Sequence, residues 1–162
     1  MHYLIDGYNL FFAIENKILP LEAKRDNFIC ALNQEIAIAN LNATLIFDGN
    51  KQNSGVFPSK QELSALDVTF SPEGLSADDY ILELLTSCPN PKMEIVVTSD
   101  RELSKKSTFL GAKTKTIESF LKFLLKKKSK KQKAKQEEKQ ELKETHYNLE
   151  RLVEIFEERL DK

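Results

Sequence analysis

The stretch over residues 3–10 constrains the fold most, because an apolar strand in it stops at an acidic residue. Residues 3–5 favour a β-strand, Asp6 follows them, and Gly7 interrupts the strand pattern before a helix-compatible apolar run. In an open α/β sheet, ligands bind at the edge where such strands end. The simpler alternative is that Asp6 and Asn9 only cap the following helix.

The same pattern, a strand followed by an acidic residue, occurs twice more in the chain. Residues 43–47 precede Asp48, and residues 93–98, which are rich in β-branched side chains, precede Asp100. We predict further strands over 2–6, 66–70 and 114–116, helices over 21–40, 76–87, 101–106 and from 117, and a loop over 49–61. Because strands alternate with helices, we expect an α/β fold with a mostly parallel central sheet.

Charge is distributed unevenly, although the net charge of the 162 residues is only −1. Residues 1–121 hold 16 acidic and 11 basic residues, whereas residues 122–135 hold 8 Lys and no acidic residue. We therefore expect one domain over 1–125 and a charged extension over 126–162. Residues 126–146 nearly lack large apolar side chains and form either a charged helix or a disordered linker. Residues 147–162 carry an apolar stripe that predicts a final helix. This stripe would pack on the first domain, on a second copy of the chain in a homodimer, or on another partner.

Several classes of protein are not expected from this composition. No apolar run approaches the ~20 residues that span a bilayer, and Asp6 interrupts the opening run, so neither a membrane segment nor a signal peptide is predicted. Cys30 and Cys88 lie in apolar patterns, which predicts reduced core residues of a cytoplasmic protein. The two histidines, His2 and His146, do not form a zinc motif.

The chain also lacks the signatures of several phosphate-handling enzymes. There is no glycine-rich phosphate loop of the nucleotide-triphosphatase or dinucleotide-binding type. A phosphoaspartyl phosphatase would have a second Asp two residues after the first, but this position is Tyr8. No set of Ser, His and Asp suggests nucleophilic catalysis, since both histidines lie near the ends of the chain.

The acidic residues at the strand ends suggest a metal site. In a parallel sheet Asp6, Asp48 and Asp100 would share one edge, and the pair Asp78 and Asp79 would join them at the start of the next helix. Carboxylates that converge in this way repel one another unless a cation lies between them. Oxygen ligands without His or Cys favour Mg²⁺ or Mn²⁺, which activates water and binds phosphodiesters in nucleases. The alternative remains that each Asp caps a helix or turn.

Four motifs together resemble the signature blocks of NYN domains, relatives of the PIN domain nucleases, and most closely those of the YacP-like branch. They are Leu4-Ile5-Asp6-Gly7-Tyr8-Asn9-Leu10, Leu45-Ile46-Phe47-Asp48-Gly49, Ala77-Asp78-Asp79-Tyr80-Ile81-Leu82-Glu83 and Val96-Val97-Thr98-Ser99-Asp100. The resemblance covers about residues 1–125 and keeps the order of the blocks. It implies a Rossmann-like three-layer α/β/α sandwich that cuts RNA internally with Mg²⁺ or Mn²⁺.

The resemblance also implies roles for individual residues. Asp6 would be the central metal ligand, with Asp78 and Asp100 as further ligands, Asp48 as an outer ligand, and Asn9 steadying the site or contacting substrate. Supporting roles would fall to three more residues: Asp79 at the helix dipole, Ser99 orienting a carboxylate or a water, and Arg101 meeting the phosphate or forming a surface ion pair.

The lysine-rich stretch suggests a nucleic-acid partner. Its lysines would attract phosphates with little sequence preference, the candidates being Lys126, Lys127, Lys128, Lys130 and Lys131. A solvated helix face is the alternative. Our first hypothesis is a cytoplasmic, metal-dependent endoribonuclease acting on mRNA or rRNA, in association with the ribosome. Our second is a non-catalytic RNA-binding or ribosome-associated adaptor on the same scaffold.

Overall fold

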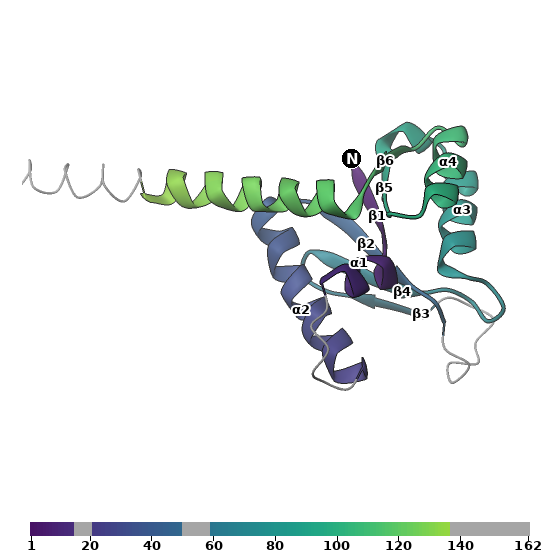
Figure 1. The fold of residues 1–162 in the computed structure, drawn as a ribbon, viewed down its shortest axis with the longest axis horizontal. Coiled ribbons are helices and arrows are strands. Elements are labelled where there is room, and N and C mark those ends of the chain that lie inside the picture. The colour runs from purple at the N-terminus through teal and green to yellow at the C-terminus, as the bar shows by residue number, and fades with distance from the viewer. Residues whose placement is uncertain (15–20, 50–58, 137–162) are drawn as a thin grey trace, which may run out of the picture. The chain divides into compact units, whose positions relative to one another are not determined.

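The computed structural model describes residues 1–14, 21–49 and 59–136. The chain divides into two compact units, Met1–Leu125 and Lys126–Lys162, which we describe separately. The first unit holds a six-stranded sheet in the order β3-β4-β2-β1-β5-β6 (Figure 1). The strands are β1 (His2–Asp6), β2 (Asn42–Phe47), β3 (Ser59–Glu62), β4 (Leu66–Phe70), β5 (Glu94–Val97) and β6 (Lys113–Lys115). Every neighbouring pair is parallel except β3 and β4.

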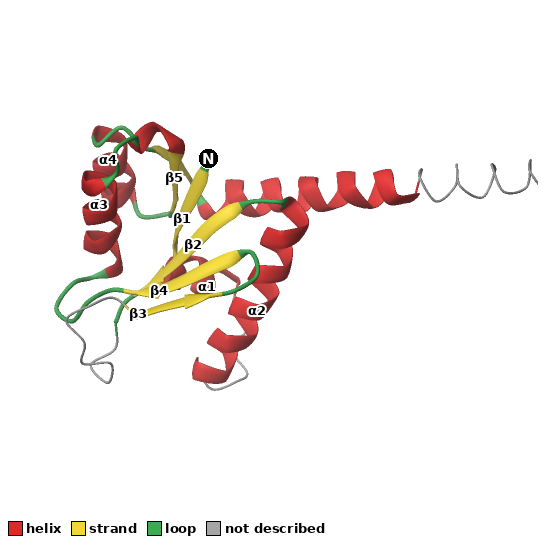
Figure 2. Cartoon of the chain, turned by 180° about the vertical axis from the view of Figure 1, so that it is seen from behind, coloured by secondary structure: helices red, strands yellow, loops and turns green. Residues whose placement is uncertain are grey.

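Helices cover both faces of this sheet (Figure 2). They are α1 (Gly7–Ile14), α2 (Leu21–Ala39), α3 (Ala77–Ser87), α4 (Arg101–Phe109) and a helix that begins at residue 117, with a short 3₁₀ turn at Pro91–Met93. One core cluster joins the sheet to α1, α2 and the residues from 117, and a second joins its other face to α3 and α4. The expected three-layer α/β/α sandwich is therefore confirmed.

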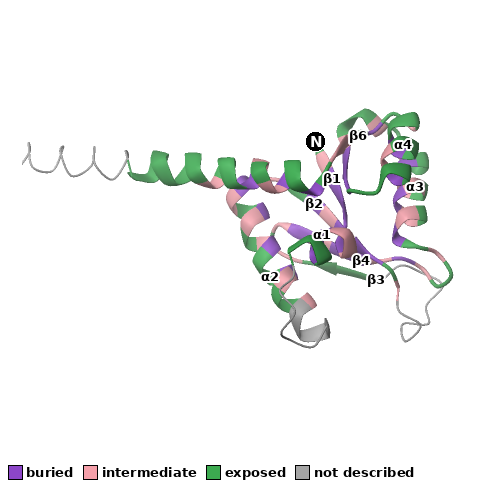
Figure 3. Ribbon diagram, viewed as in Figure 1, coloured by how far each residue is buried: buried purple, intermediate pink, exposed green. Residues whose placement is uncertain are grey.

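The alternation of side chains along β1 explains how the two layers are filled. Tyr3 and Ile5 point into the cluster under α2, whereas Leu4 points into the cluster under α3. Strand β5 is likewise buried on both faces, as its sequence predicted (Figure 3). By the same alternation, Asp6 follows Leu4 onto the α3 side of the sheet.

The order of the strands places β1 at the point where the chain reverses its direction across the sheet. From β1 the chain builds outward through β2 to β4, and it then returns to add β5 on the other side of β1. The ends of the strands beside such a switch point are where α/β proteins bind their ligands. Asp6 ends β1 and therefore lies at this position.

Three sequence expectations are wrong in detail. The predicted loop over 49–61 includes the beginning of β3, which pairs antiparallel with β4. Helix α1 begins at Gly7, earlier than the apolar run suggested, because the Asp6 carboxylate accepts the N–H of Asn9 and supports the first turn. The cysteines are free, as expected, but Cys30 is exposed and Cys88 half-buried, so they are not core residues.

In the second unit, residues 126–136 are helical and almost entirely exposed. This agrees with the charged-helix alternative for that part of 126–146. The apolar stripe over 147–162, and the homodimer predicted from it, lie outside the described residues. Within the described residues, no helix is long and apolar enough to cross a membrane.

Candidate active site

Asp6 is the most buried of the predicted site residues, with 8% of its surface exposed at the end of β1. Its Oδ1 accepts a hydrogen bond from the Asn9 backbone N–H at 3.1 Å, and its Oδ2 accepts one from the Thr98 hydroxyl at 3.4 Å. The Asp100 backbone N–H donates in turn to the Thr98 hydroxyl at 3.1 Å. These bonds hold the Asp6 carboxylate between the first turn of α1 and the end of β5.

The surroundings of Asp6 raise its pKa from 3.8 to about 6. Burial is the largest cause, and the negative charges of Asp78 and Asp48 add to it, whereas the hydrogen bonds from Asn9 and Thr98 act in the opposite direction. The pKa of Asp78 is also raised, mainly by burial and then by the charges of Asp100, Asp48 and Asp79. The five strand-end and helix-start acids predicted to share one edge are thus close enough for their charges to affect Asp6 and Asp78.

Asp48 and Asp78 meet at the beginning of α3. Asp48 lies one residue beyond β2, and its Oδ1 accepts the backbone N–H of Ala77 at 2.6 Å. Ser76 caps the helix by accepting the N–H of Asp79 at 3.1 Å and donating its hydroxyl to the Asp79 carboxylate at 2.8 Å. These two bonds to Ser76 account for Asp79, whereas Asp78 takes no part in them.

The loop after β5 supplies the remaining predicted residues. Asp100 caps α4 by accepting the Leu103 N–H on Oδ1 at 2.7 Å. Ser99 donates its backbone N–H to the Asn9 side-chain oxygen at 2.9 Å, so Asn9 ties α1 to this loop. Arg101 is exposed at the first position of α4.

A cavity of about 300 Å³ opens over part of this acidic group. It is lined by Asp6, Tyr8, Asn9, Phe12, Asp48, Ser76, Ala77 and Asp78. The structure therefore brings Asp6, Asp48 and Asp78 to one cavity. Asp100 does not line this cavity and joins the group through its charge on Asp78.

The donor set of this edge fits a hard divalent cation such as Mg²⁺ or Mn²⁺, because it consists of carboxylate oxygens that repel one another. Lys106 lowers the pKa of Asp78 less than burial and the neighbouring acids raise it, and Lys106 is itself paired with Glu102 at 2.8 Å. In the part of the chain that the structure describes, however, no three His, Cys, Asp or Glu side chains already form a set that could hold a metal ion. The carboxylates are near enough to help raise the pKa of Asp6 and Asp78 but are not gathered into a coordination sphere.

Sequence reasoning overlooked three residues of the site. Thr98 links the Asp6 carboxylate to the Asp100 backbone, and Tyr8 and Phe12 form part of the cavity wall. Thr98 could have been found as a polar residue directly after the apolar run Ile95–Val97. Tyr8 and Phe12 could have been found because they are four residues apart in the helix after Asp6, a spacing that places both side chains on one face.

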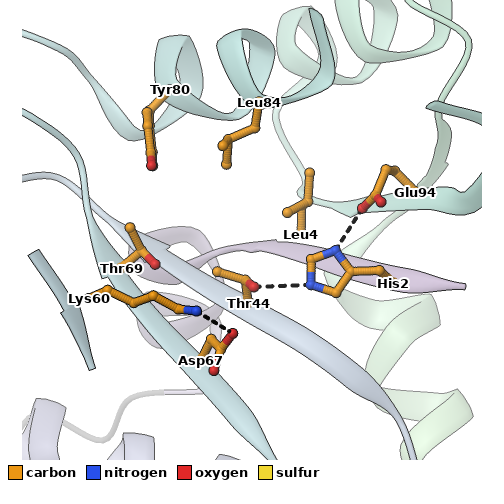
Figure 4. A pocket seen from close by; sticks show the side chains of 9 residues that line it. All are labelled: His2, Leu4, Thr44, Lys60, Asp67, Thr69, Tyr80, Leu84 and Glu94. Atoms are coloured by element: carbon orange, nitrogen blue, oxygen red, sulfur yellow. Dashed lines mark hydrogen bonds and ion pairs between the residues drawn. The ribbon is translucent and has the colours of Figure 1, made fainter. Parts of the chain in front are cut away.

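A second cavity, of about 320 Å³, lies between α3 and the sheet, away from these carboxylates (Figure 4). His2 lies 2.7 Å from Glu94 and 3.0 Å from Thr44, and Lys60 pairs with Asp67 at 3.2 Å. The charged side chains of this cavity are therefore paired with one another. It contains none of the predicted site residues, and we attribute it to the part of the sheet that α3 leaves uncovered.

Comparisons with known proteins agree with the fold and the motifs. The model of the YacP-like NYN domain matches residues 3–162, so the chain belongs to the YacP-like NYN domain family, a family of PIN-like nucleases. The match continues through the charged C-terminal segment, beyond the 1–125 region of the motif resemblance. Divalent metals are the usual cofactors of PIN-like NYN nucleases.

Solved structures show the same fold. The crystal structure of Rae1 (YacP) from Bacillus subtilis is 20% identical, with a TM-score of 0.61 over 97% of this chain and 92% of that chain. A mutant of the same protein is 21% identical, with a TM-score of 0.61 over 80% of this chain and 77% of that chain. No curated protein matches the sequence.

Proposed function

We propose that this protein is a hydrolase, a metal-dependent endoribonuclease that cleaves RNA phosphodiester bonds at the edge of the sheet where Asp6 lies. The observation that carries the proposal is the burial of Asp6 at the switch point of the sheet, where burial first and then the charges of Asp78 and Asp48 raise its pKa to about 6. Folding alone does not require such repulsion, which destabilises the chain unless a cation is bound. Membership of a nuclease family supports the same conclusion.

In this proposal Asp6, Asp78 and Asp100 hold Mg²⁺ or Mn²⁺, and Asp48 is an outer ligand. When bound, the cation would lower the pKa of a water molecule and offset the charge of the phosphodiester. The Thr98 hydroxyl and the Asn9 N–H keep the Asp6 carboxylate oriented toward the cavity. Asn9 also fixes the loop that carries Asp100 through its bond to the Ser99 N–H.

The remaining predicted residues have supporting roles in the proposal. Asp79 stabilises the start of α3 through its bonds with Ser76. Ser99 would orient a carboxylate or a water, and Arg101, at the first position of α4, would meet the substrate phosphate. The exposed lysines at 126–131 would bind RNA phosphates without sequence preference. We propose mRNA or rRNA as the substrate, the cytoplasm as the location and the ribosome as the setting.

The second candidate is a non-catalytic RNA-binding or ribosome-associated adaptor, and one observation favours it. Asp6, Asp48 and Asp100 each accept a backbone N–H at the start of a helix, so each has a structural role that needs no metal. Capping does not explain why the negative charges of these acids gather at one edge with Asp78, where they help to raise the pKa of Asp6 and of Asp78. We therefore prefer the nuclease.

The test is cleavage of labelled RNA by the purified full chain with Mn²⁺ or Mg²⁺, and again with EDTA. We expect internal cuts that EDTA abolishes. We expect Asp6→Asn to lose cleavage while keeping the fold and RNA binding, because Asn preserves the shape and the bond to Asn9. Mn²⁺ should raise the melting temperature of the parent more than that of Asp6→Asn.

The matched control is Asp67→Asn, the same change on β4 at the ion pair with Lys60, where cleavage should be unaffected. Equal cleavage by Asp6→Asn and the parent would refute the site assignment. Absence of cleavage over a broad panel of RNAs, with RNA binding retained, would favour the adaptor.

A further inference from the structure

Phe12 is an exposed aromatic side chain in the wall of the acidic cavity. It lies on α1 with 59% of its surface exposed, and its ring stacks on Tyr8 with centroids 5.7 Å apart and planes at 18°. Tyr8 packs edge-on against the buried Phe47 at 4.9 Å. The Phe12 ring is therefore held by a series of rings anchored in the core, while much of it remains open to solvent.

Single exposed apolar side chains are common and need no explanation by themselves. Ile14 on the same helix is 49% exposed, and Phe109 on α4 is 91% exposed. Neither of these lines the cavity that contains Asp6, whereas Phe12 does. Its position beside the carboxylates distinguishes Phe12 from the other exposed apolar residues.

The chemistry of the cavity wall indicates what Phe12 could bind. Among the described residues, three carboxylates and no Lys or Arg line the wall. These residues offer the RNA backbone no positive charge, so attraction at this part of the wall comes from a bound cation and from uncharged groups. Stacking of a base on an aromatic ring is such an attraction, and it contributes about 5- to 150-fold in affinity per base.

We propose that Phe12 is a stacking platform for an unpaired RNA base next to the bond that is cleaved. A base in a duplex is already stacked between its neighbours and cannot lie on a side chain, whereas a base in a single strand can. This inference rests on the proposed nuclease function, to which it adds a substrate-binding residue.

The experiment measures binding rather than cleavage, in the full chain carrying Asp6→Asn, with Mg²⁺ present. The probe is a short single-stranded oligoribonucleotide with 2-aminopurine at its centre, whose fluorescence is quenched by stacking, and the same strand annealed to its complement. Phe12→Leu keeps an apolar side chain but removes the ring, and Phe12→Tyr keeps the ring. Ile14→Ala is the matched control on the same helix.

We expect Phe12→Leu to weaken single-strand binding by about 5- to 150-fold and to lose the quenching. Phe12→Tyr and Ile14→Ala should behave like the Asp6→Asn chain, and the duplex should bind more weakly and be insensitive to Phe12. Unchanged affinity and quenching in Phe12→Leu, or duplex binding as tight as single-strand binding, would overturn the proposal. Circular dichroism and melting curves would confirm that each variant is folded.

The outcome is separable from that of the proposed function. A parent chain that never cleaves RNA, but whose single-strand binding depends on the Phe12 ring, would refute the nuclease and retain the stacking platform. A parent chain that cleaves with Mn²⁺, but whose binding and cleavage are unchanged in Phe12→Leu, would retain the nuclease and refute the platform.

Discussion

Asp6 is both buried and close to other negative charges, and each of these raises the free-energy cost of ionising its carboxyl group. As the residue after a buried strand it is largely removed from water, and as a neighbour of Asp78 and Asp48 it experiences their negative charge. The Asn9 N–H and the Thr98 hydroxyl compensate only in part, because the pKa of Asp6 remains raised to about 6. The ionised carboxylate is thus a cost to the folded, metal-free chain.

This cost predicts how stability depends on pH. The pKa of Asp6 is higher in the folded chain than in the unfolded chain, so between about pH 4 and pH 6 the folded chain keeps a proton on Asp6 that the unfolded chain has lost. The free energy of unfolding therefore falls as pH rises through that window. Asp6→Asn should remove this loss and be more stable at pH 7 by up to about 2–3 kcal/mol. Urea unfolding in EDTA across the window measures both. The same pH dependence of stability in the parent and in Asp6→Asn would contradict this prediction.

At the scale of elements, the sequence was sufficient where a strand is apolar and ends in an acidic residue. Strands β1, β2, β4 and β5 and helix α3 were predicted because each carries its own periodicity and stop signals. Strand β3, with the sequence Ser-Lys-Gln-Glu, has no such signal and exists because the edge of β4 accepts an antiparallel partner. Its pairing is a property of the sheet, which no local pattern records.

The candidate site shows the same contrast between features that local sequence patterns predict and features that depend on contacts between distant residues. The order of the strands placed the predicted acids at one edge because the ends of parallel strands necessarily meet there. The sequence could not show that Asp100, whose Oδ1 accepts the Leu103 N–H, would not line the cavity with Asp6, Asp48 and Asp78. The role of Thr98 was also hidden, because it depends on a hydrogen bond between residues 92 positions apart.

Gly7 explains why helix α1 can begin where it does. A Cβ atom on Gly7 would lie 2.6 Å from the Phe47 ring and 2.7 Å from the carbonyl oxygen of Ile46, so only glycine lets α1 approach β2 this closely. We expect Gly7→Ala to lower the free energy of unfolding by about 1–3 kcal/mol through overpacking. Chemical denaturation of the full chain measures this.

The control for that prediction is Ala31→Gly at an exposed position of α2. There, alanine should be the more stable residue by about 1 kcal/mol, because it favours a helix. A Gly7→Ala chain that gains stability, as expected from helix preference alone, would show that the close contact does not limit this position.

On the scale of the whole molecule, charge is divided between a predominantly acidic first unit and the lysines around its boundary with the second. Residues 1–121 carry an excess of five negative charges, and residues 122–135 carry eight positive charges. The cavity that would perform the chemistry is therefore poorly suited to attract RNA by itself. Attraction over longer distances would come from the lysine-rich segment.

Salt dependence tests this division of labour. Changing Lys126, Lys127 and Lys130 to Gln should weaken RNA binding and reduce the slope of log affinity against log salt by up to about 0.7 for each lysine that contacts a phosphate. The matched control changes three exposed lysines of the first unit to Gln, namely Lys92, Lys105 and Lys113. If both triple variants have the same slope, the segment is only a solvated helix face.

The helix caps made by Asp48 and Asp100 determine how an inactive form of this protein should be built. Replacing either residue with alanine removes a negative charge and also leaves a backbone N–H without its acceptor. Loss of cleavage in such a variant would not distinguish loss of the proposed metal site from loss of the helix cap. Asparagine deletes the charge and still accepts the bond. Chains intended to trap RNA without cutting it should therefore carry amides at these positions.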